Sequence, residues 1–495
     1  MPYRRRQQDR FIVARLEYDL GMTPQRNVSR RTWLKSAGVA GIAALAGCTG
    51  GGDGGDGGSG DGSSDGGDGG SGSSDGGDGG STPTETMGDS GGGGGTPDVL
   101  VVIGYPQDGI QLFRDYYSQS DGNEEILIPD GLRDPALPGQ VGNDMANVTG
   151  TAPAAGGPNQ QAFADQFNEE YGEGPGVFTS QSYDSVAIGI LANAAAGENS
   201  GTAVRDQMRR IANPGGMEVG PQNFIEGVEA AANGEDVNYQ GASSATNFDE
   251  NGDPASAAYA IWNFVGADEE ATETAEVQNF EGDSPEGAGD SADSGPGGFG
   301  RTASVGILLP ETGTLASVGQ PMIQAARLPA TLVNDSDLDL TVDAQIEDTQ
   351  TDPSAGVAAA NSLVNAGVPF VCGSASSGVN VPVSQQAFIP NEVVGCSPSS
   401  TALSVTNLED DDYIFRTAPS DRLQGRVMAQ VASERLEGAT AATLYVNNDY
   451  GQQLSERFSG VFEDSFDGEV FAQIAYNQNE PSYTSVVQEA LTSGN

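Results

Sequence analysis

The stretch VPFVCGSASSGVNVPVSQQAFIPNEVVGCSPSST, residues 368–401, decides the fold. Two short apolar runs, at 368–372 and 393–396, each end at a patch of Gly and Ser. Short apolar runs bounded by turn residues are typical of strands buried on both faces. The intervening residues 379–388 can form a crossover helix. The stretch therefore predicts one βαβ unit with two parallel strands.

The two patches of small polar residues, 373–378 and 397–401, then lie at the carboxyl ends of neighbouring parallel strands. In open α/β sheets that edge is where ligands bind. Hydroxyl groups and free backbone N–H groups at helix starts suit a carboxylate or another small polar group. One patch alone would indicate ordinary turn and helix-cap chemistry, but two matched patches on adjacent strands favour a ligand site.

The chain is strongly acidic, with 70 Asp and Glu against 21 Lys and Arg and a formal charge of −49. Self-repulsion at this charge weakens a compact fold in dilute buffer, whereas molar salt shortens the screening distance to about 3 Å. The composition resembles that of haloarchaeal proteins; an acidic surface kept for solubility is the alternative. No basic patch is interleaved with aromatic residues, so nucleic acid is not an expected partner.

The sequence contains no histidine. This excludes His-based catalytic triads, His metal sites and the usual general base near neutral pH, so we expect neither an enzyme nor a metal or other cofactor. Of the three cysteines, Cys372 and Cys396 end the two strands described above. They can form a disulfide outside the cell or remain buried thiols, and the sequence leaves both readings open.

Residues 1–48 have the pattern of an export signal. Arg30 and Arg31 resemble the twin-arginine motif, and a short apolar run at 37–46 follows them. The LAGC sequence that ends at Cys48 looks like a lipobox, in which this cysteine becomes the lipid-bearing residue. The apolar run is shorter than the about 20 residues of a spanning helix, and a single-pass anchor is the alternative.

Four segments follow the signal. Residues 49–96 are Gly, Ser and Asp with almost nothing apolar, which predicts a tether that forms no core. Residues 97–265 and 301–495 alternate strand-like and helix-like patterns, which predicts a doubly wound α/β fold. Residues 266–300 return to acidic sequence with Gly and Pro and are interpreted as a second linker.

Both blocks resemble the branched-chain amino-acid (Leu/Ile/Val) class of ABC-transporter substrate-binding proteins. The matching text of the second block is VGILLPETGTLASVGQPMIQAA, FVCGSASSGV, SPSST and NNDYG. That of the first block is PDVLVVIGYPQDG, SYDSVAIGILANA and YQGASSATNFDENGDP. The resemblance covers nearly all of the sequence expected to fold. It implies the two-lobed type I periplasmic-binding fold, in which each lobe is a parallel sheet flanked by helices and crossover strands join the lobes.

The resemblance also implies a function. Proteins of this class close two lobes over a small-molecule ligand and deliver it to the membrane subunits of an ABC permease. With its signal, this chain would be a monomer, exported by the twin-arginine route and lipid-anchored on the extracellular face of the cell membrane. A ligand-sensing receptor coupled to a signalling partner is the alternative. A secreted Ser hydrolase is disfavoured, because no GxSxG elbow stands in a strand–turn–helix context and histidine is absent.

The two blocks stand in inverted order relative to that family, in which the block matching 301–495 precedes the block matching 97–265. We therefore interpret the folded part as a circular permutant, with residues 266–300 joining the family's usual C-terminus to its N-terminus. About 35 flexible residues reach on the order of 30 Å, enough for such a join. A domain-swapped dimer of two half-domains is the alternative.

Aligning these motifs implies a ligand site. The ligand's carboxylate would meet hydroxyl and backbone groups of the two small-residue loops, at Ser376, Ser377, Ser399, Ser400 and Thr401. The facing lobe would contribute Tyr450 from NNDYG and Tyr105 from GYP, each a flat apolar surface with one polar tip. A half-buried surface tyrosine is the alternative at both positions.

Two positions depart from the family pattern. The acid that holds the ligand's ammonium in amino-acid binders aligns with Asn147, a neutral group, and Val318 replaces an aromatic residue of the first loop. A bare ammonium group pays a large desolvation cost in a cleft without an anion. The expected ligands therefore widen from branched-chain amino acids to neutral amides, urea-like compounds and organic acids. For Asn147, a plain turn residue is the alternative.

Overall fold

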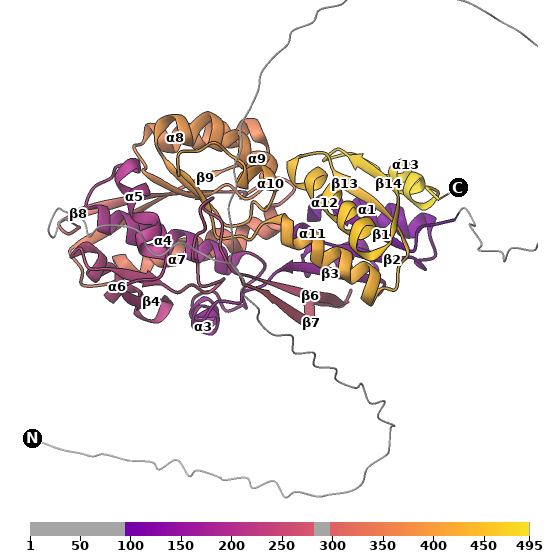
Figure 1. The fold of residues 1–495 in the computed structure, drawn as a ribbon, viewed down its shortest axis with the longest axis horizontal. Helices are drawn as coiled ribbons and strands as arrows, with labels where there is room; N and C mark the ends of the chain where they lie inside the picture. Colours follow the sequence, from indigo (N-terminus) through magenta and orange to yellow (C-terminus); the bar gives the residue numbers. More distant parts are fainter. Residues whose placement is uncertain (1–94, 282–297, 495) are drawn as a thin grey trace, which may run out of the picture. The chain divides into compact units, whose positions relative to one another are not determined.

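The computed structural model describes residues 95–281 and 298–494. The predicted signal region, its Cys48 and nearly all of the predicted tether lie outside these described residues. Within them the chain forms two large sheets, each flanked by helices, which we call lobe A and lobe B (Figure 1). The predicted two-lobed α/β fold is confirmed.

Lobe A is built on a seven-stranded sheet of described residues, in the order β14-β13-β1-β2-β3-β6-β7. Its strands are β1 (Val99–Ile103), β2 (Glu125–Ile128), β3 (Val148–Pro153), β6 (Ala257–Gly266), β7 (Glu269–Phe280), β13 (Thr440–Val446) and β14 (Glu469–Tyr476). Its helical elements are α1 (Pro106–Gln119), η1 (Asp130–Leu132), α2 (Leu137–Val141), α11 (Asp421–Gln430), η5 (Val431–Arg435), α12 (Asp449–Phe466) and α13 (Thr484–Leu491). All pairs are parallel except β3–β6 and β6–β7.

Lobe B is built on a five-stranded parallel sheet of described residues, in the order β12-β11-β10-β8-β9. Its strands are β8 (Arg301–Leu309), β9 (Leu340–Asp348), β10 (Phe370–Gly373), β11 (Val394–Ser397) and β12 (Ile414–Arg416), with the small pair β4 (Met217–Val219) and β5 (Val237–Tyr239) beside them. Its helical elements are α3 (Gln160–Tyr171), α4 (Thr179–Ala196), α5 (Gly201–Ala212), η2 (Pro221–Asn223), α6 (Phe224–Ala232), α7 (Ala316–Asn334), α8 (Pro353–Asn365), α9 (Ser377–Val383), η3 (Ser384–Phe388), η4 (Ile389–Asn391) and α10 (Leu403–Thr406).

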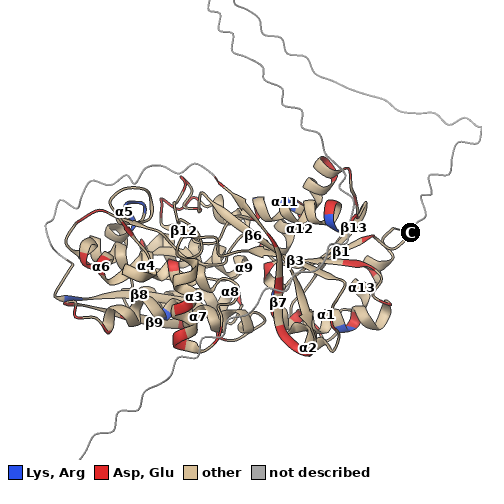
Figure 2. Cartoon of the chain, turned by 90° about the horizontal axis from the view of Figure 1, so that it is seen from below, with Lys and Arg blue, Asp and Glu red and all other residues tan. Residues whose placement is uncertain are grey.

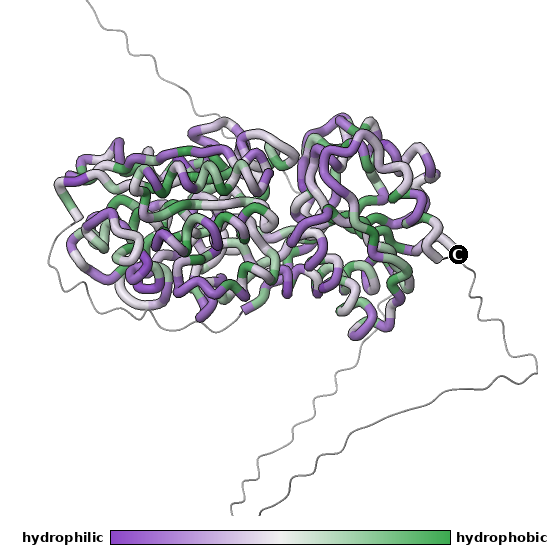
Figure 3. Tube along the Cα trace, turned by 90° about the horizontal axis from the view of Figure 1, so that it is seen from above, coloured by the Kyte–Doolittle hydropathy of each residue, from purple (hydrophilic) through white to green (hydrophobic). Residues whose placement is uncertain are grey.

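The hydrophobic core is built on strands whose residues are apolar along their whole length. Every residue of β1 is fully buried, as expected of a central parallel strand covered on both faces. In lobe B, α4 is buried along almost its whole length, and its Gly189 lies against the Phe370 ring of β10, where a Cβ atom would be 2.3 Å from the ring. Hydrophobic segments run along these inner elements, while acidic residues are spread over outer ones such as β7 (Figures 2 and 3).

The βαβ unit predicted from residues 368–401 is present. Strands β10 and β11 are parallel neighbours, with Cys372 directly in register with Cys396. Helix α9 and the π-helical turn η3 form the crossover. The possible disulfide between the two cysteines does not form, because both are free, buried thiols.

Part of the predicted linker 266–300 is a strand. β7 pairs antiparallel with β6 at the edge of the lobe A sheet, so the linker prediction is wrong for residues 269–280. The sequence EEATETAEVQNF lacks the apolar alternation of a half-buried strand because most of its side chains face solvent. Acidic side chains on such an edge disfavour pairing with another chain.

The two sequence blocks contribute to both lobes. β1 of the first block pairs with β13 of the second, so one sheet needs both. Helix α3 belongs to lobe B, because the Gln166 amide donates to the Pro221 carbonyl and the Tyr171 hydroxyl donates to the Gln324 carbonyl. A Cβ atom at Gly494 would lie 2.3 Å from the Gly95 carbonyl oxygen. The first and the last described residues are therefore close together in space.

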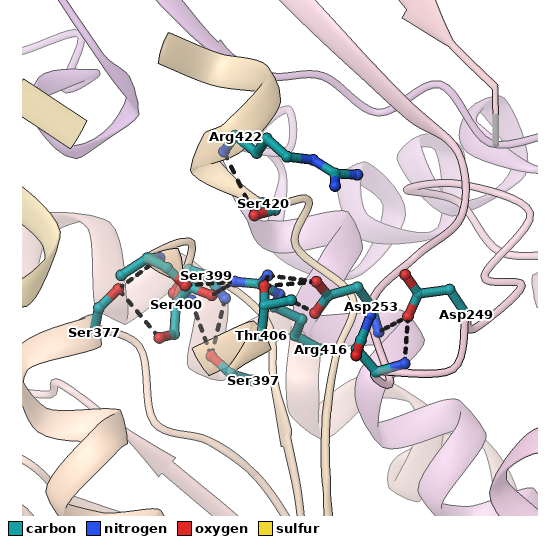
Figure 4. A network of polar contacts seen from close by, with 12 residues as sticks. Asp249, Asp253, Ser377, Ser397, Ser399, Ser400, Thr406, Arg416, Ser420 and Arg422 are labelled. Carbon is teal, nitrogen blue, oxygen red and sulfur yellow. Dashed lines mark hydrogen bonds and ion pairs between the residues drawn. The ribbon is translucent and has the colours of Figure 1, made fainter. Parts of the chain in front are cut away.

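A buried ion pair fastens the blocks together beneath the serine-rich loop (Figure 4). The Arg416 guanidinium is fully buried and donates to both carboxylate oxygens of Asp253, at 2.5 and 2.7 Å. It also donates to the carbonyls of Ser400 and Ala402, both at 3.1 Å. Thr406 donates to Asp253 as well, at 2.8 Å. Arg416 thus holds the 397–402 loop in place through two of its backbone carbonyls.

Removing one partner of this pair should be strongly destabilising. We expect Arg416→Met to lower the free energy of unfolding by about 3–5 kcal/mol, because it leaves Asp253 buried without a counter-charge. The double variant Arg416→Met with Asp253→Leu should recover part of that loss. Denaturant unfolding at high salt measures both.

The exposed pair Arg205–Asp206 supplies the control, because the Asp206 side chain is 55% exposed. Asp206→Ala should change the free energy of unfolding by no more than about 1 kcal/mol. Equal losses for Arg416→Met and Asp206→Ala would show that the buried pair does not anchor the loop.

Candidate functional site

A cavity of about 320 Å³ lies between the loops at the carboxyl ends of strands from both lobes. Part of this empty space is open to solvent. Lobe B contributes Phe178, Leu315, Val318, Ala375, Ser376, Ser377 and Ser399, and lobe A contributes Tyr105, Asp130, Gly131 and Tyr450. Five of the residues named from the sequence therefore line one cavity: Tyr105, Ser376, Ser377, Ser399 and Tyr450.

The serine loops form the polar wall on lobe B. The Ser377 hydroxyl oxygen accepts from the Ser400 hydroxyl and from the Ala402 N–H, both at 3.2 Å. Because its oxygen already accepts twice, its own proton is available to a bound acceptor. Ser399 donates to the Ala375 carbonyl at 3.2 Å and also lines the cavity.

Two of the predicted residues support the wall without lining it. Ser400 is buried behind Ser377 and holds it in place. Thr401 is also fully buried, and its carbonyl accepts from the Asp421 N–H at the start of α11. Both belong to the same loop as Ser399, which explains why the sequence could not separate the lining residues from the supporting ones.

Tyrosines form the opposite wall on lobe A. The Tyr105 and Tyr450 rings are stacked, with centroids 5.9 Å apart, and both side chains are buried. The Tyr105 hydroxyl bonds the Ser376 hydroxyl of lobe B at 2.8 Å and accepts from the Asn448 amide at 3.0 Å. Burial raises the pKa of Tyr105 to about 12, so it stays a neutral phenol.

Asp130 is the acidic residue of the cavity and was not predicted from the sequence. It begins the turn η1 directly after β2, and its carboxylate accepts from the Gln424 amide and from the Tyr450 hydroxyl. Burial raises the pKa of Asp130 to about 6, despite these hydrogen bonds. At neutral pH the cavity therefore holds one carboxylate without a basic partner among its lining residues.

The prediction for Asn147 is wrong. Asn147 precedes β3, at the opposite edge of the sheet from the cavity, and bonds with Tyr117 and the Glu124 carbonyl. The acidic residue that lines the cavity instead stands at the end of β2, in the sequence IPDGL. The same signal that identified the serine loops, an apolar run stopped by a turn, was present there at 125–130.

Hydrogen bonds join the lobes around the cavity. Besides the Tyr105–Ser376 bond, the Gln453 amide oxygen accepts from the Ser404 N–H at 2.8 Å. The Thr314 hydroxyl donates to the Gln478 amide oxygen at 2.6 Å. All of these contacts are between uncharged groups. The lobes are therefore held together over the cavity by neutral polar contacts.

The comparisons with known proteins agree with this geometry. The family model described as periplasmic binding protein matches residues 94–261 and 302–495. The chain is 30% identical over 162 residues to "Leu/Ile/Val-binding protein homolog 3" of Brucella melitensis, covering 32% of this chain and 43% of that protein. It is 29% identical over 166 residues to the "Leucine-, isoleucine-, valine-, threonine-, and alanine-binding protein" of Pseudomonas aeruginosa, covering 33% and 44%.

The chain thus spans less than half the length of these curated relatives. Among solved structures it is similar to a leucine binding protein from Thermotoga maritima, with 21% identity and a TM-score of 0.36 over 39% of this chain and 53% of that one. The family model covers most of the chain, and both of its matched segments contribute walls to the cavity. The chain therefore belongs to the periplasmic binding protein family.

Proposed function

We propose that this chain is the solute-binding component of an ABC importer and binds a small zwitterionic amino acid between its lobes. One observation carries the proposal: the cavity places hydroxyl groups on one wall and an unpaired carboxylate, Asp130, on the other. The serines suit an α-carboxylate, and Asp130 suits an α-ammonium. Two stacked tyrosines cover the remaining apolar part of the ligand.

Asp130 changes the expected ligand class. The sequence widened the expected ligands from branched-chain amino acids to neutral amides, urea-like compounds and organic acids, because Asn147 offered no anion. With Asp130 in the cavity, an ammonium group gains a charge partner, and an organic acid without an ammonium would face an uncompensated carboxylate. The two curated relatives are named as binding proteins for amino acids, which supports an amino acid as the ligand.

Binding operates by closure of the lobes. The chain passes between the lobes after β3, before β6 and after β12, so these segments are the hinges. A ligand that contacts Ser377 in lobe B and Asp130 in lobe A stabilises the closed arrangement over the open one. The closed arrangement is then the form presented to the permease.

The proposal also includes a lipid anchor at Cys48 and a circularly permuted order of the two sequence blocks. The LAGC sequence at Cys48 would carry a lipid after twin-arginine export, and residues 49–96 would tether a monomer to the extracellular face of the cell membrane. None of the described helices is long and apolar enough to cross a membrane. The permuted order is supported by the proximity of Gly494 to Gly95, and a collinear comparison with a permuted chain is expected to cover about half of each relative.

A thermal-shift screen of the twenty common amino acids, with amides and organic acids alongside, tests the function. At high salt we expect a neutral or acidic amino acid to raise the melting temperature, because a ligand that binds only the folded state stabilises it. Ser377→Ala should weaken that ligand about tenfold by removing a donor to its carboxylate. Thr202→Ala, far from the cavity, is the control. No stabilising amino acid, or an unchanged affinity in Ser377→Ala, would contradict the proposal.

Affinity should depend on pH through Asp130. A carboxylate is needed to pair with the ammonium, so affinity should be level above about pH 6 and fall as the pH drops below it. Asp130→Asn should bind about 10–100-fold more weakly and lose this dependence. Calorimetric titrations on either side of pH 6 measure both effects.

Asp108→Asn is the matched control for Asp130, because Asp108 is also a buried acid of lobe A whose pKa burial raises, yet it does not line the cavity. This variant should keep the pH dependence of binding. A wild-type affinity that does not change through pH 6 would exclude Asp130 as the partner of the ammonium.

Lipid anchoring makes a separate prediction. Cys48→Ala should release the exported protein into the medium, because a single lipidated residue then no longer attaches it to the membrane. Fractionation of cells expressing the wild type and the variant, followed by immunoblotting, measures the distribution. Membrane retention of Cys48→Ala would contradict the lipobox assignment without affecting the ligand site.

A further inference from the structure

A second and larger cavity adjoins the proposed ligand site. It encloses about 1580 Å³ of empty space, part of it open to solvent, and is lined by segments of both lobes. The two cavities share Phe178 and Val318 as walls. Because Val318 is a small side chain, it forms only a thin wall between the proposed ligand site and the second cavity.

Arg133 faces this second cavity without an acidic partner. No carboxylate lies within 4.0 Å of its guanidinium among the described residues, in a chain with 70 acidic side chains. Its carbon Cζ lies 5.3 Å from the Trp262 ring centroid, and one long hydrogen bond of 3.5 Å reaches the Thr272 hydroxyl. Burial lowers the pKa of Arg133 to about 10, so the group is still a cation at neutral pH.

The neighbouring acid, Asp134, forms no ion pair with Arg133. Asp134 also lines the cavity, but its carboxylate accepts from the Ala136 N–H at the start of α2. The other polar residues that line this cavity are uncharged and include Gln160, Gln181 and Thr274. A half-buried guanidinium with this surrounding is a receptor for an anion, because charge-assisted hydrogen bonds to a carboxylate would satisfy its free N–H groups.

Arg133 and Asp130 stand on the same turn. The Arg133 N–H donates to the Asp130 carbonyl at 2.9 Å, so one turn presents a carboxylate to the ligand site and a cation to the adjoining cavity. A ligand held by the serines and Asp130 can extend its side chain past Val318 toward Arg133.

We propose that the cavity around Arg133 is an anion subsite, and that the ligand is an amino acid with a second carboxylate at the end of its side chain. This inference rests on the proposed function and specifies its substrate class. Each charge of such a ligand has a partner: serine hydroxyls for the α-carboxylate, Asp130 for the ammonium and Arg133 for the distal carboxylate. The competing role for Arg133 is structural, fastening the β6–β7 hairpin through Trp262 and Thr272.

Matched ligand pairs test the subsite. Calorimetry on the folded chain compares aspartate with asparagine, glutamate with glutamine, and 2-aminoadipate with norleucine, at the lowest salt that preserves the native circular dichroism. We expect at least one acid to bind about tenfold or more tightly than its uncharged partner, as a charged hydrogen-bonded contact predicts. In Arg133→Gln that preference should vanish, while the affinity for the uncharged partner stays within about twofold.

Two further variants separate binding from packing. Arg133→Lys keeps the charge and should keep part of the preference even if Arg133→Gln does not fold. Thr272→Val removes the hydrogen bond to the hairpin but leaves the guanidinium, and should keep the full preference. Equal losses of affinity for both members of a pair in Arg133→Gln would assign Arg133 the structural role and overturn the proposal.

The remaining outcomes distinguish this inference from the function on which it rests. If the wild type binds uncharged amino acids as tightly as acids in all three pairs, the anion subsite is excluded and the proposed function stands. If no amino acid binds, the proposed function itself fails, and the subsite fails with it.

Discussion

The buried pair between Arg416 and Asp253 is the interaction on which the site depends. Arg416 ends β12, the last strand before the chain crosses into lobe A, and Asp253 precedes β6, where the chain makes another crossing. The same guanidinium holds the carbonyls of Ser400 and Ala402. One side chain therefore links two crossing segments to the loop that positions Ser377. The burial of Arg416 is tolerable because each N–H group of its guanidinium has an acceptor and Asp253 supplies a counter-charge.

The geometry of the parallel sheets determines where the cavity lies. Each lobe directs the carboxyl ends of its central strands toward the other, so loops after β1, β2, β10 and β11 meet in one cavity. Those loops carry hydroxyls on one side and phenols with a carboxylate on the other. Neither lobe alone offers partners for both ends of the proposed zwitterionic ligand. In the proposed function, binding and closure are therefore one event.

Much of this was predictable from the sequence, and the failures have physical reasons. The βαβ unit at 368–401 and the serines follow from strand periodicity and the sheet-edge rule, and Tyr105 and Tyr450 from family motifs. Asp130 was missed because short motifs do not fix which of several neighbouring strands carries the acid. β7 was missed because an exposed edge strand shows no apolar alternation. The sequence left open whether Cys372 and Cys396 form a disulfide, and the structure has them as free thiols in register on neighbouring strands.

The uncharged contacts between the lobes have a consequence for how the closed arrangement depends on ionic strength. Two strongly acidic bodies repel each other at low ionic strength, and dissolved ions suppress that repulsion. The contacts of Tyr105 with Ser376, of Gln453 with Ser404 and of Gln478 with Thr314 carry no net charge, so dissolved ions leave them largely intact. Rising ionic strength therefore weakens the repulsion between the lobes and spares the hydrogen bonds that join them, which favours the closed arrangement.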